Sequence, residues 1–404
     1  MTQFLAKGAF GSIFKTDDEV TKINIHDRDF LGIRCLPEYD IASRLIHPNL
    51  IHAKRISPEG HLIFPYYPYT IWSKEFFALP SQRKEILVEQ LLSAVFAIHK
   101  AGYLHLDIKG NNIFINDDMT NLVLADFGSA IWIGSSESKT LTRECVSPFY
   151  RSPEHIRARI AGQKELTYSR EDDYWALGLS VLECLSEKED PYYDIAFDHN
   201  ETFYYDQKNR LINYKFIKEL CPNLSQRWYD TLVGLLSWDP TDRQLPLVGT
   251  YQSAKLVTPH YGKYRKDYLN DEIKDFLKQN MSSYIGEPVE SIFLAIDLYI
   301  RTRHLHYTRE KILLTCVWIS LKMITSCTID PRDICEDEDL WIIEQEIIKE
   351  VKGVIYPPNP YNSSLDSDDL YLAWQKIGQP VTDPIYIFNL NQITIRQFRY
   401  IRDF

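Results

Sequence analysis

Short apolar and aromatic runs at the start of the chain are typical of β-strands. Four strands and one short helix are predicted there, the strands at 4–10, 11–15, 19–25 and 61–67 and the helix near 37–46. The sequence therefore predicts that the chain begins with a small β-rich unit.

Near residue 81 the pattern changes to the 3.6-residue period of amphipathic helices. Apolar residues recur at positions 86, 87, 91, 92, 95, 96 and 98, and Gly102 provides a stop signal. Two more strands are predicted at 112–116 and 122–127, and mostly helical segments continue to about residue 240.

The stretch 239–262 is rich in Pro, Gly, Thr and Ser, which favours a connection between domains. A second helical block follows it, from about 263 to 352. The predicted organisation is a first domain at 1–250, a linker at 251–262, a helical domain at 263–385 and a tail at 386–404.

Composition narrows the class of protein. A hydrophobic fraction of 45% with 13% aromatic residues excludes disorder for most of the chain. The net charge of −11 argues against nucleic acid and anionic membrane surfaces as partners. Seven cysteines without a C-x-x-C pair favour free thiols in a reducing compartment. With no signal peptide and no apolar run of membrane-spanning length, we expect an intracellular protein, cytoplasmic or nuclear.

The stretch "YLHLDIKGNNIFI", residues 103–115, concentrates polar chemistry between apolar flanks. Phosphoryl transfer needs a carboxylate that accepts the substrate hydroxyl proton, oxygen ligands for a divalent metal and a cation on the phosphates. Asp107 fits the base, Lys109 a phosphate contact, and Asn112 with the downstream Asp126 the metal ligands. This loop is therefore a candidate active site.

Two upstream features suit phosphate binding. In "AKGAFGSIF", Gly8 and Gly11 flank a tight turn where bare backbone N–H groups can approach a phosphate. Lys22, in "EVTKI", can reach the phosphates if a carboxylate holds its side chain extended.

In this order, these motifs resemble the eukaryotic protein kinase family over residues 4 to about 245. The resemblance implies an α+β bilobal fold, with a β-rich N-lobe at about 1–68 and a helical C-lobe at about 69–250. It places Glu38 as the helix glutamate that pairs with Lys22. Three further matches are structural, namely Glu154 in "SPE", Asp173 bracing the catalytic loop, and Arg243 pairing with Glu154.

The same resemblance implies ATP and Mg²⁺ as cofactors. It carries the nucleotide-binding role onto Ala6, Gly8, Phe10, Gly11, Ile13, Lys22, Phe64, Tyr66 and Tyr67. Phe64 stands at the gatekeeper position, whereas Ala6 replaces the usual first glycine. Lys109, two residues after the base, is typical of Ser/Thr kinases, and His105 receives no chemical role.

The segment "TRECVSPFYRSPEH", 142–155, resembles the activation segment of cyclin-dependent kinases, with Thr142 at their activating threonine. Their inhibitory Thr-Tyr pair is here Ala9 and Phe10. The three arginines that grip the phosphothreonine in that family are here Pro37, Leu106 and Ile131. We therefore expect activity that does not need phosphorylation of Thr142.

The second helical block resembles a cyclin box, with matches at 271–280, 290–305, 309–324 and 344–361. Lys322 and Glu344 match cyclin residues that face the kinase. An unrelated all-α helical domain is the alternative, because apolar stripes at helical spacing also occur in ordinary bundles.

The resemblances together predict a Ser/Thr protein kinase with its own cyclin-like activator, docked within the chain or head-to-tail between two chains. Protein substrates are expected, and Ser147 with Pro148 hints at proline after the acceptor. A pseudokinase scaffold and a small-molecule kinase are the alternatives. The intact catalytic residues disfavour the first, and the peptide-docking "YRSPE" segment disfavours the second.

Overall fold

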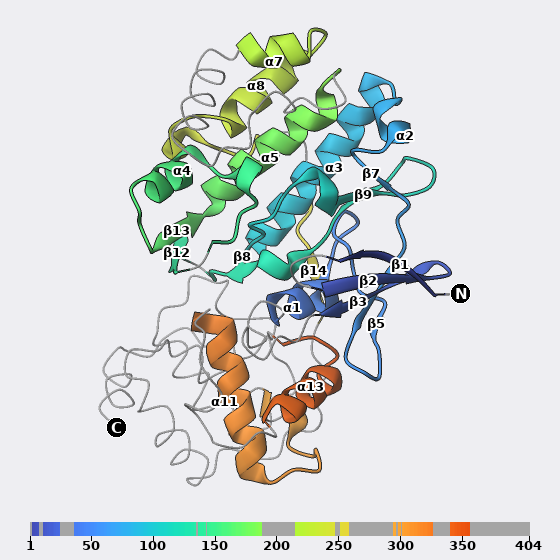
Figure 1. Cartoon of the computed structure of the whole chain (residues 1–404), viewed down its shortest axis with the longest axis vertical. Helices are drawn as coiled ribbons and strands as arrows, with labels where there is room; N and C mark the ends of the chain where they lie inside the picture. Colours follow the sequence, from blue (N-terminus) through green and yellow to red (C-terminus); the bar gives the residue numbers. More distant parts are fainter. Residues whose placement is uncertain are drawn as a thin grey trace. The chain divides into compact units, whose positions relative to one another are not determined.

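In a computed structural model, the described residues form two compact units (Figure 1). The described residues are 2–7, 11–24, 36–134, 136–142, 144–187, 215–246, 251–257, 294–295, 298–299, 301–325 and 340–355. The first unit takes its described residues from Met1–Arg44, Ala53–Phe64 and Leu256–Phe404, and the second from Leu45–His52 and Pro65–Lys255. Described residues beyond 256 therefore belong to the same compact unit as the N-terminal strands.

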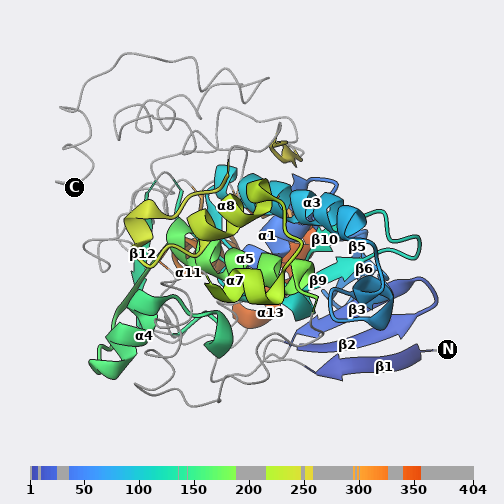
Figure 2. The same ribbon diagram turned by 90° about the horizontal axis from the view of Figure 1, so that it is seen from above.

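A five-stranded sheet in the order β1-β2-β3-β6-β5 organises the first unit. Its strands are β1 (Thr2–Lys7), β2 (Gly11–Thr16), β3 (Glu19–Asn24), β5 (Arg55–Ile56) and β6 (Leu62–Pro65). Figures 1 and 2 both draw β1, β2 and β3 side by side, and the antiparallel register pairs Ile13 with Lys22. The four predicted strands are present with shifted ends, whereas the two-residue β5 was not predicted.

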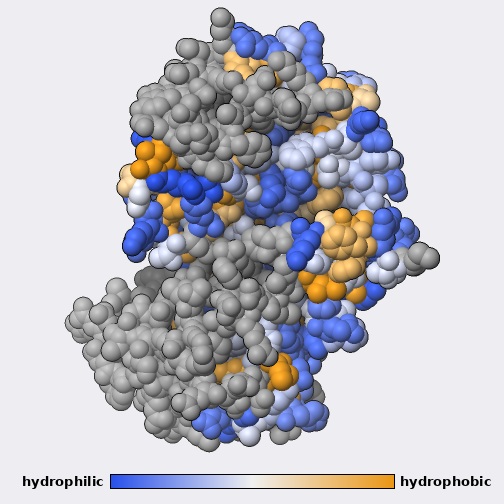
Figure 3. Space-filling model, viewed as in Figure 1, coloured by the Kyte–Doolittle hydropathy of each residue, from blue (hydrophilic) through white to orange (hydrophobic). Residues whose placement is uncertain are grey.

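Part of this sheet carries apolar side chains on its surface. Phe4, Leu5 and Ile23 are exposed large hydrophobic residues of β1 and β3, and an orange patch lies over these strands in Figure 3. Phe4 packs edge-on against Phe14 with ring centroids 5.6 Å apart.

The helix α1 (Leu36–Arg44) is buried on nearly every side, although it contains three charged residues. Asp40 and Arg44, one turn apart, neutralise each other at 2.7 Å, and both are at most 1% exposed. The Tyr39 hydroxyl donates a hydrogen bond to the carbonyl of Gly60 in the β5–β6 turn.

Two helices of the C-terminal region belong to the same unit as α1. They are α11 (Arg309–Thr325), which contacts α1, and α13 (Leu340–Glu350), which packs against α11. Leu314, Trp318 and Leu340 form a buried cluster between them, with Trp341 against it. The helix predicted at 309–324 is confirmed. The segment 344–361, predicted as a helix and its exit, contains the end of α13, which begins earlier, at Leu340. The helix predicted at 271–280 and parts of the one at 290–305 lie outside the described residues.

After α13 the chain turns back against α1. Gly353 has a φ of +72°, and a Cβ atom there would lie 2.4 Å from the Ser43 Oγ and 3.0 Å from the Ile56 Cδ1. Glycine is therefore required twice, by the backbone conformation and by the close approach to α1.

The second unit is mainly helical. Its helices are α2 (Lys74–Phe77), α3 (Ser81–Lys100), α4 (Pro153–Ile160), α5 (Arg170–Leu185), α7 (Lys215–Leu220) and α8 (Gln226–Leu235). The apolar face predicted from the 3.6-residue period buries α3 against α5. Within the described residues, no helix has both the length and the apolar character needed to cross a bilayer.

Short strand pairs hold the loops of the second unit. They are β7 (Tyr69–Thr70), β9 (Ile113–Ile115) and β10 (Leu122–Leu124) in one sheet, β8 (Tyr103–Leu104) with β11 (Ile131–Trp132), and β12 (Ser138–Leu141) with β13 (Leu166–Ser169). Two further strands, β4 (Leu45–Ile46) and β14 (Lys255–Leu256), lie where the chain passes between the units. Four cysteines of the described part, Cys145, Cys184, Cys221 and Cys316, are free thiols, as the spacing predicted.

The first residues of the predicted linker are held against the second unit. The Tyr251 ring stacks on Phe96 with centroids 5.2 Å apart, and the Gln252 amide donates to the Ser93 Oγ at 3.5 Å. At Tyr251 and Gln252 the chain therefore contacts α3, and the linker predicted at 251–262 stays a prediction.

Candidate active site

The loop from β8 to β9 has a strained backbone that one buried carboxylate holds in place. Leu106, a buried residue, adopts a φ of +60°, which is unfavourable for a side chain of this size. Asp173 of α5 accepts hydrogen bonds from the amides of Leu106 and His105, each at 2.8 Å. The brace predicted for Asp173 is thus present, and the His99 Nε2 contacts the same carboxylate at 2.8 Å.

Asp173 remains ionised despite its burial. Desolvation raises its pKa, but the contacts from His99 and from the His105 amide outweigh this effect and hold the pKa below its usual range.

His105 is a neutral packing residue in this loop. Its Nδ1 accepts from the Asp107 amide at 3.2 Å, so its Nε2 carries the hydrogen and donates to the Ala125 carbonyl at 3.2 Å. Complete burial lowers the pKa of His105 and keeps the ring uncharged. These contacts hold the ring within the loop, and the absence of a chemical role for His105 stays a prediction.

The Asp107 carboxylate lies at the centre of a cluster of donors. Its Oδ2 accepts from the Lys109 Nζ at 2.8 Å and from the Asn112 Nδ2 at 3.1 Å. Its Oδ1 accepts from the Ser147 Oγ at 2.6 Å, and Lys109 also donates to that Oγ at 2.9 Å. The carboxylate therefore already accepts a hydroxyl proton donor in the direction a general base requires.

The sequence links Ser147 only to the peptide preference of the kinase, and it does not predict the contact of Ser147 with Asp107. The two residues are forty positions apart in sequence. No local pattern brings them together, because the contact depends on the path of the segment between β11 and α4.

Asn112 and Asp126 are held next to each other by the backbone. The Ala125 amide donates to the Asn112 carbonyl at 2.9 Å, and the Asn112 Nδ2 donates to the Asp107 carbonyl at 2.8 Å. Because the Asn112 Nδ2 donates this hydrogen bond, the Asn112 Oδ1 is the side-chain atom that could bind a metal. One carboxylate and one amide oxygen fit Mg²⁺, which commonly takes few protein ligands and completes its shell with water and phosphate.

Asp126 itself has a φ of +61°, and its side chain accepts from the Gly128 amide at 3.4 Å. An aspartate tolerates this left-handed conformation better than most residues. The conformation is still strained, so it persists only where the surrounding structure imposes it.

Within the first unit, the ion pair predicted between Lys22 and Glu38 is present. The Lys22 Nζ lies 2.6 Å from the Glu38 Oε1, and both side chains are largely buried. Strand β3 supplies the lysine and α1 the glutamate, so the position of α1 determines whether this pair forms.

The other residues predicted for nucleotide binding are spread over both units. Ala6 lies on exposed β1, Gly11 and Ile13 on β2, and Phe64 is buried on β6. Tyr66 and Tyr67, both half-buried, follow in the second unit. Gly8 and Phe10 lie outside the described residues, so their role stays a prediction.

The predicted ion pair between Glu154 and Arg243 is also present. Arg243 Nη1 and Nη2 donate to the two carboxylate oxygens of Glu154 at 2.5 and 2.8 Å. Burial raises the pKa of Glu154, but the arginine outweighs it and holds the pKa below its usual value. The pair fixes the start of α4 to the η5 turn (Pro240–Asp242).

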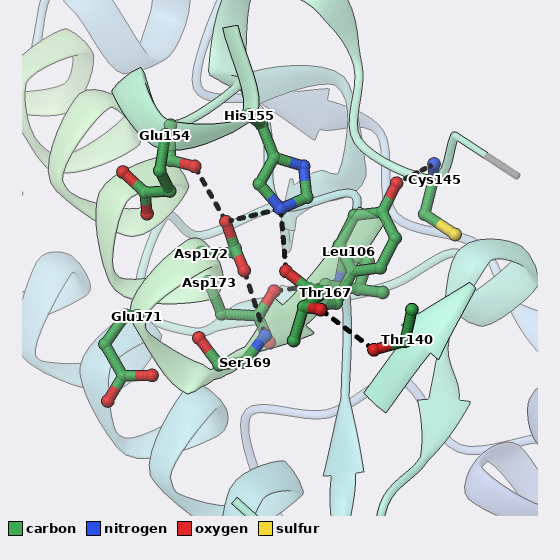
Figure 4. Close-up of polar contacts among 12 residues, drawn as sticks. Leu106, Thr140, Cys145, Glu154, His155, Thr167, Ser169, Glu171, Asp172 and Asp173 are labelled. Carbon is green, nitrogen blue, oxygen red and sulfur yellow. Dashed lines mark hydrogen bonds and ion pairs between the residues drawn. The ribbon is translucent and has the colours of Figure 1, made fainter. Parts of the chain in front are cut away.

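A buried polar cluster under β12 and β13 was not predicted (Figure 4). The His155 Nε2 lies 3.0 Å from the Thr167 carbonyl and 3.3 Å from the Asp172 Oδ1. Asp172 also closes a capping box with Ser169 at the start of α5, and burial raises its pKa. The S-x-x-D spacing from Ser169 to Asp172 was the available sequence signal for this cap.

Lys322 and Glu344 bond to each other across α11 and α13. Both side chains are nearly inaccessible, and the Lys322 Nζ lies 3.9 Å from the centroid of the Trp318 ring. The geometry therefore makes this pair part of the packing between the two helices. Its predicted contact with the kinase stays a prediction.

Comparisons with known proteins match residues from both units. The family model described as the protein kinase domain matches residues 5–247, more than half of the chain. CTD kinase subunit alpha of Schizosaccharomyces pombe is 27% identical over 199 residues, covering 46% of this chain and 32% of the relative.

Two further relatives align over longer segments. Serine/threonine-protein kinase ULK3 of Xenopus laevis is 26% identical over 265 residues, covering 60% of this chain and 52% of the relative. Probable cyclin-dependent kinase 10 of Dictyostelium discoideum is 27% identical over 285 residues, covering 59% of this chain and 74% of the relative. The chain thus spans about a third of the length of the Schizosaccharomyces pombe relative and about half of the length of the Xenopus laevis relative.

Proposed function

The chain belongs to the protein kinase domain family, and on that premise we propose that it transfers the γ-phosphate of ATP to serine and threonine hydroxyls of proteins. One observation carries the proposal: the buried Asp107 carboxylate is held by Lys109, Asn112 and the Ser147 hydroxyl. The relative from Xenopus laevis supports the acceptor class, because it is named a serine/threonine-protein kinase.

Each side chain has a defined role in this proposal. Asp107 accepts the proton of the substrate hydroxyl, and Lys109 neutralises charge on the transferred phosphoryl group. Asn112 and Asp126 would hold Mg²⁺, which supplies charge stabilisation on the phosphates. Lys22, paired with Glu38 at 2.6 Å, would contact the ATP phosphates.

The test is phosphate transfer from radiolabelled ATP to a mixed protein pool. Asp107→Asn should lower the rate by about 100-fold or more, because general-base catalysis contributes about 10²–10⁴-fold. Asp126→Asn should also abolish Mg²⁺-dependent ATP binding, with the melting temperature of both variants close to wild type. Full activity in Asp126→Asn would refute the assignment. Transfer only to small molecules would favour the alternative of a small-molecule kinase.

We further propose that the helices beyond residue 256 activate the kinase as a cyclin-like domain. The supporting observation is that α1, which carries Glu38, is buried on nearly every side and contacts α11. Losing that cover would expose apolar side chains of α1 to water, at about 25 cal/mol per Å². The packing thus favours the position of α1 in which Glu38 reaches Lys22.

Truncation after Val257 tests this second proposal. The shortened chain should transfer phosphate weakly, and residues 258–404 added in trans should restore activity only at high concentration. A tether can raise the effective concentration of a weak docking surface to about millimolar. If the activity of the full chain rises with protein concentration, the docking is head-to-tail between chains. A truncated chain as active as the full one would exclude cyclin-type activation.

A further inference from the structure

An exposed tryptophan lies directly on the loop that carries the proposed base. Trp72 follows β7, and β7 pairs with β9, the strand that continues the catalytic loop. The indole packs on Gly110, where a Cβ atom would lie 2.4 Å from the Trp72 Nε1 and 2.6 Å from its Cε2. Gly110 therefore provides the space in which the indole sits.

Hydrogen bonds order the turn that carries Trp72. The Trp72 amide donates to the Thr70 Oγ1 at 3.3 Å, and the Ser73 amide donates to the Thr70 carbonyl at 3.0 Å. Ser73 then caps α2 by accepting from the Phe76 amide at 3.3 Å. Trp72 is thus held in a turn between a strand and a helix.

The backbone amide of Gly110 also has a partner. Its amide donates to the Tyr150 hydroxyl at 3.4 Å, and that hydroxyl donates to the Glu183 Oε1 at 2.7 Å. Gly110 therefore contacts both Trp72 and Tyr150, which is three residues after Ser147.

Trp72 is nevertheless 54% exposed, although so large an aromatic side chain is usually mostly buried. Gly110 is three residues after Asp107 in the chain, and a stretch of that length spans at most about 11 Å. An extended peptide whose hydroxyl reaches Asp107 can therefore place a neighbouring side chain on the indole within about four residues of the acceptor.

We propose that Trp72 determines substrate specificity by binding an arginine or lysine side chain near the acceptor residue of a protein substrate. This inference rests on the proposed kinase function. Tryptophan is the best aromatic partner for a cation, and the chain is acidic, with a net charge of −11. The charges of the exposed Lys74 and Glu75 on α2 cancel each other. The face of the indole is then the group that attracts a cation of the substrate.

The experiment uses the full chain and a peptide set with one serine. Every position within four residues of that serine is varied among Arg, Lys, Leu and Glu. Wild type should prefer a basic residue at one position by about fivefold in kcat/KM over leucine, the scale of an exposed cation–π contact. Trp72→Ala should remove this preference through KM, leaving kcat and the KM for ATP unchanged, and Trp72→Phe should retain part of it.

Ile86→Ala is the matched control, because Ile86 is an exposed apolar residue of α3 in the same unit. It should keep the full preference. An unchanged basic preference in Trp72→Ala, or a wild-type preference for leucine at that position, overturns the inference alone. An equal fall in kcat on every peptide would show a merely structural role and also overturn it. A wild type that phosphorylates no protein or peptide overturns the proposed function itself, and the inference with it.

Discussion

Two neighbouring buried carboxylates of α5 have pKa values that are shifted in opposite directions. Asp173 is ionised by its partners and holds the strained amide of Leu106, whereas the pKa of its neighbour Asp172 is raised. The two adjacent aspartates therefore form a matched pair for testing how the catalytic loop is held.

Asp173→Asn should lower the free energy of unfolding by about 2–4 kcal/mol, because one of two buried acceptors becomes a donor facing backbone N–H groups. Asp172→Asn should cost less, because burial already disfavours its charge and the Ser152 hydroxyl can accept from the new amide. Urea unfolding of both variants measures the difference. Equal losses would show that the charge on Asp173 is not what holds the loop.

Stability should also fall below neutral pH because of His105. Burial lowers its folded pKa below the ordinary value of 6.5, so from about pH 6.5 downward the unfolded chain binds a proton that the folded chain does not. The stability contributed above pH 6.5 is then lost as the pH falls toward the folded pKa, by at most about 1.4 kcal/mol per pH unit for this group. The pKa values of His47, His52 and His61 are lowered too, and these residues act in the same direction.

Urea unfolding between pH 7.5 and 5.5 measures this slope. His105→Gln, which does not titrate, should flatten the slope while the other histidines keep part of it. An identical slope in the variant would mean that His105 is protonated in the folded protein.

The residues that sequence reasoning identified share one property: each belongs to a short motif with fixed spacing. Asp107, Asn112 and Asp126 could be found this way, and Lys22 could be matched to Glu38. The contact of Ser147 with Asp107 could not, because it depends on the three-dimensional path of a loop.

At the scale of elements, strand pairing holds the segment before Thr142. β12 and β13 pair antiparallel from Ser138↔Ser169 to Leu141↔Leu166, and Thr140 hydrogen-bonds to Thr167 at 2.8 Å (Figure 4). Just beyond Thr142, Glu144 accepts from Arg151 at 2.7 Å and also bonds to Arg159 of α4. A fixed anion and a strand ladder thus tie this segment to the second unit.

We therefore expect Thr142→Ala to keep activity within about threefold of the unmodified wild type, a barrier change below about 1 kcal/mol. Expression in a host without upstream kinases, with mass spectrometry of Thr142, provides the comparison. Leu106 and Ile131 are buried and apolar, so their side chains cannot grip a phosphate. A hundredfold loss in Thr142→Ala, with wild-type activity following phosphate at that site, would contradict the expectation.

Elements with strong periodicity could be predicted, and short polar ones could not. The α3 helix and strands β2 and β3 follow clear patterns, whereas β12 reads "SKTL" and has no apolar alternation to reveal it. Its pairing with β13 is set by tertiary packing, which local propensity does not encode.

At the scale of the whole molecule, the described C-terminal residues share a compact unit with α1. The separate helical domain at 263–385 stays a prediction, because most of its residues lie outside those that the structure describes. Its boundary was inferred from composition, whereas a compact unit is defined by the side chains that it buries. The near-complete burial of a nine-residue helix with three charged side chains is what periodicity could not predict.

Gly353 allows this arrangement to be tested without truncation. In Gly353→Ala, the new methyl group would meet the Ser43 Oγ of α1, and the φ of +72° adds strain of about 1–2 kcal/mol. Gly162→Ala is the control, because its φ of +68° brings the same strain while nothing lies within 4 Å of the added atom. We expect Gly353→Ala to lower kinase activity severalfold and to lose more stability than Gly162→Ala, whose activity should stay near wild type. Ser43→Ala should partly rescue Gly353→Ala, because it removes the closest atom. Equal activity in the two glycine variants would mean that the contact with α1 does not control the enzyme.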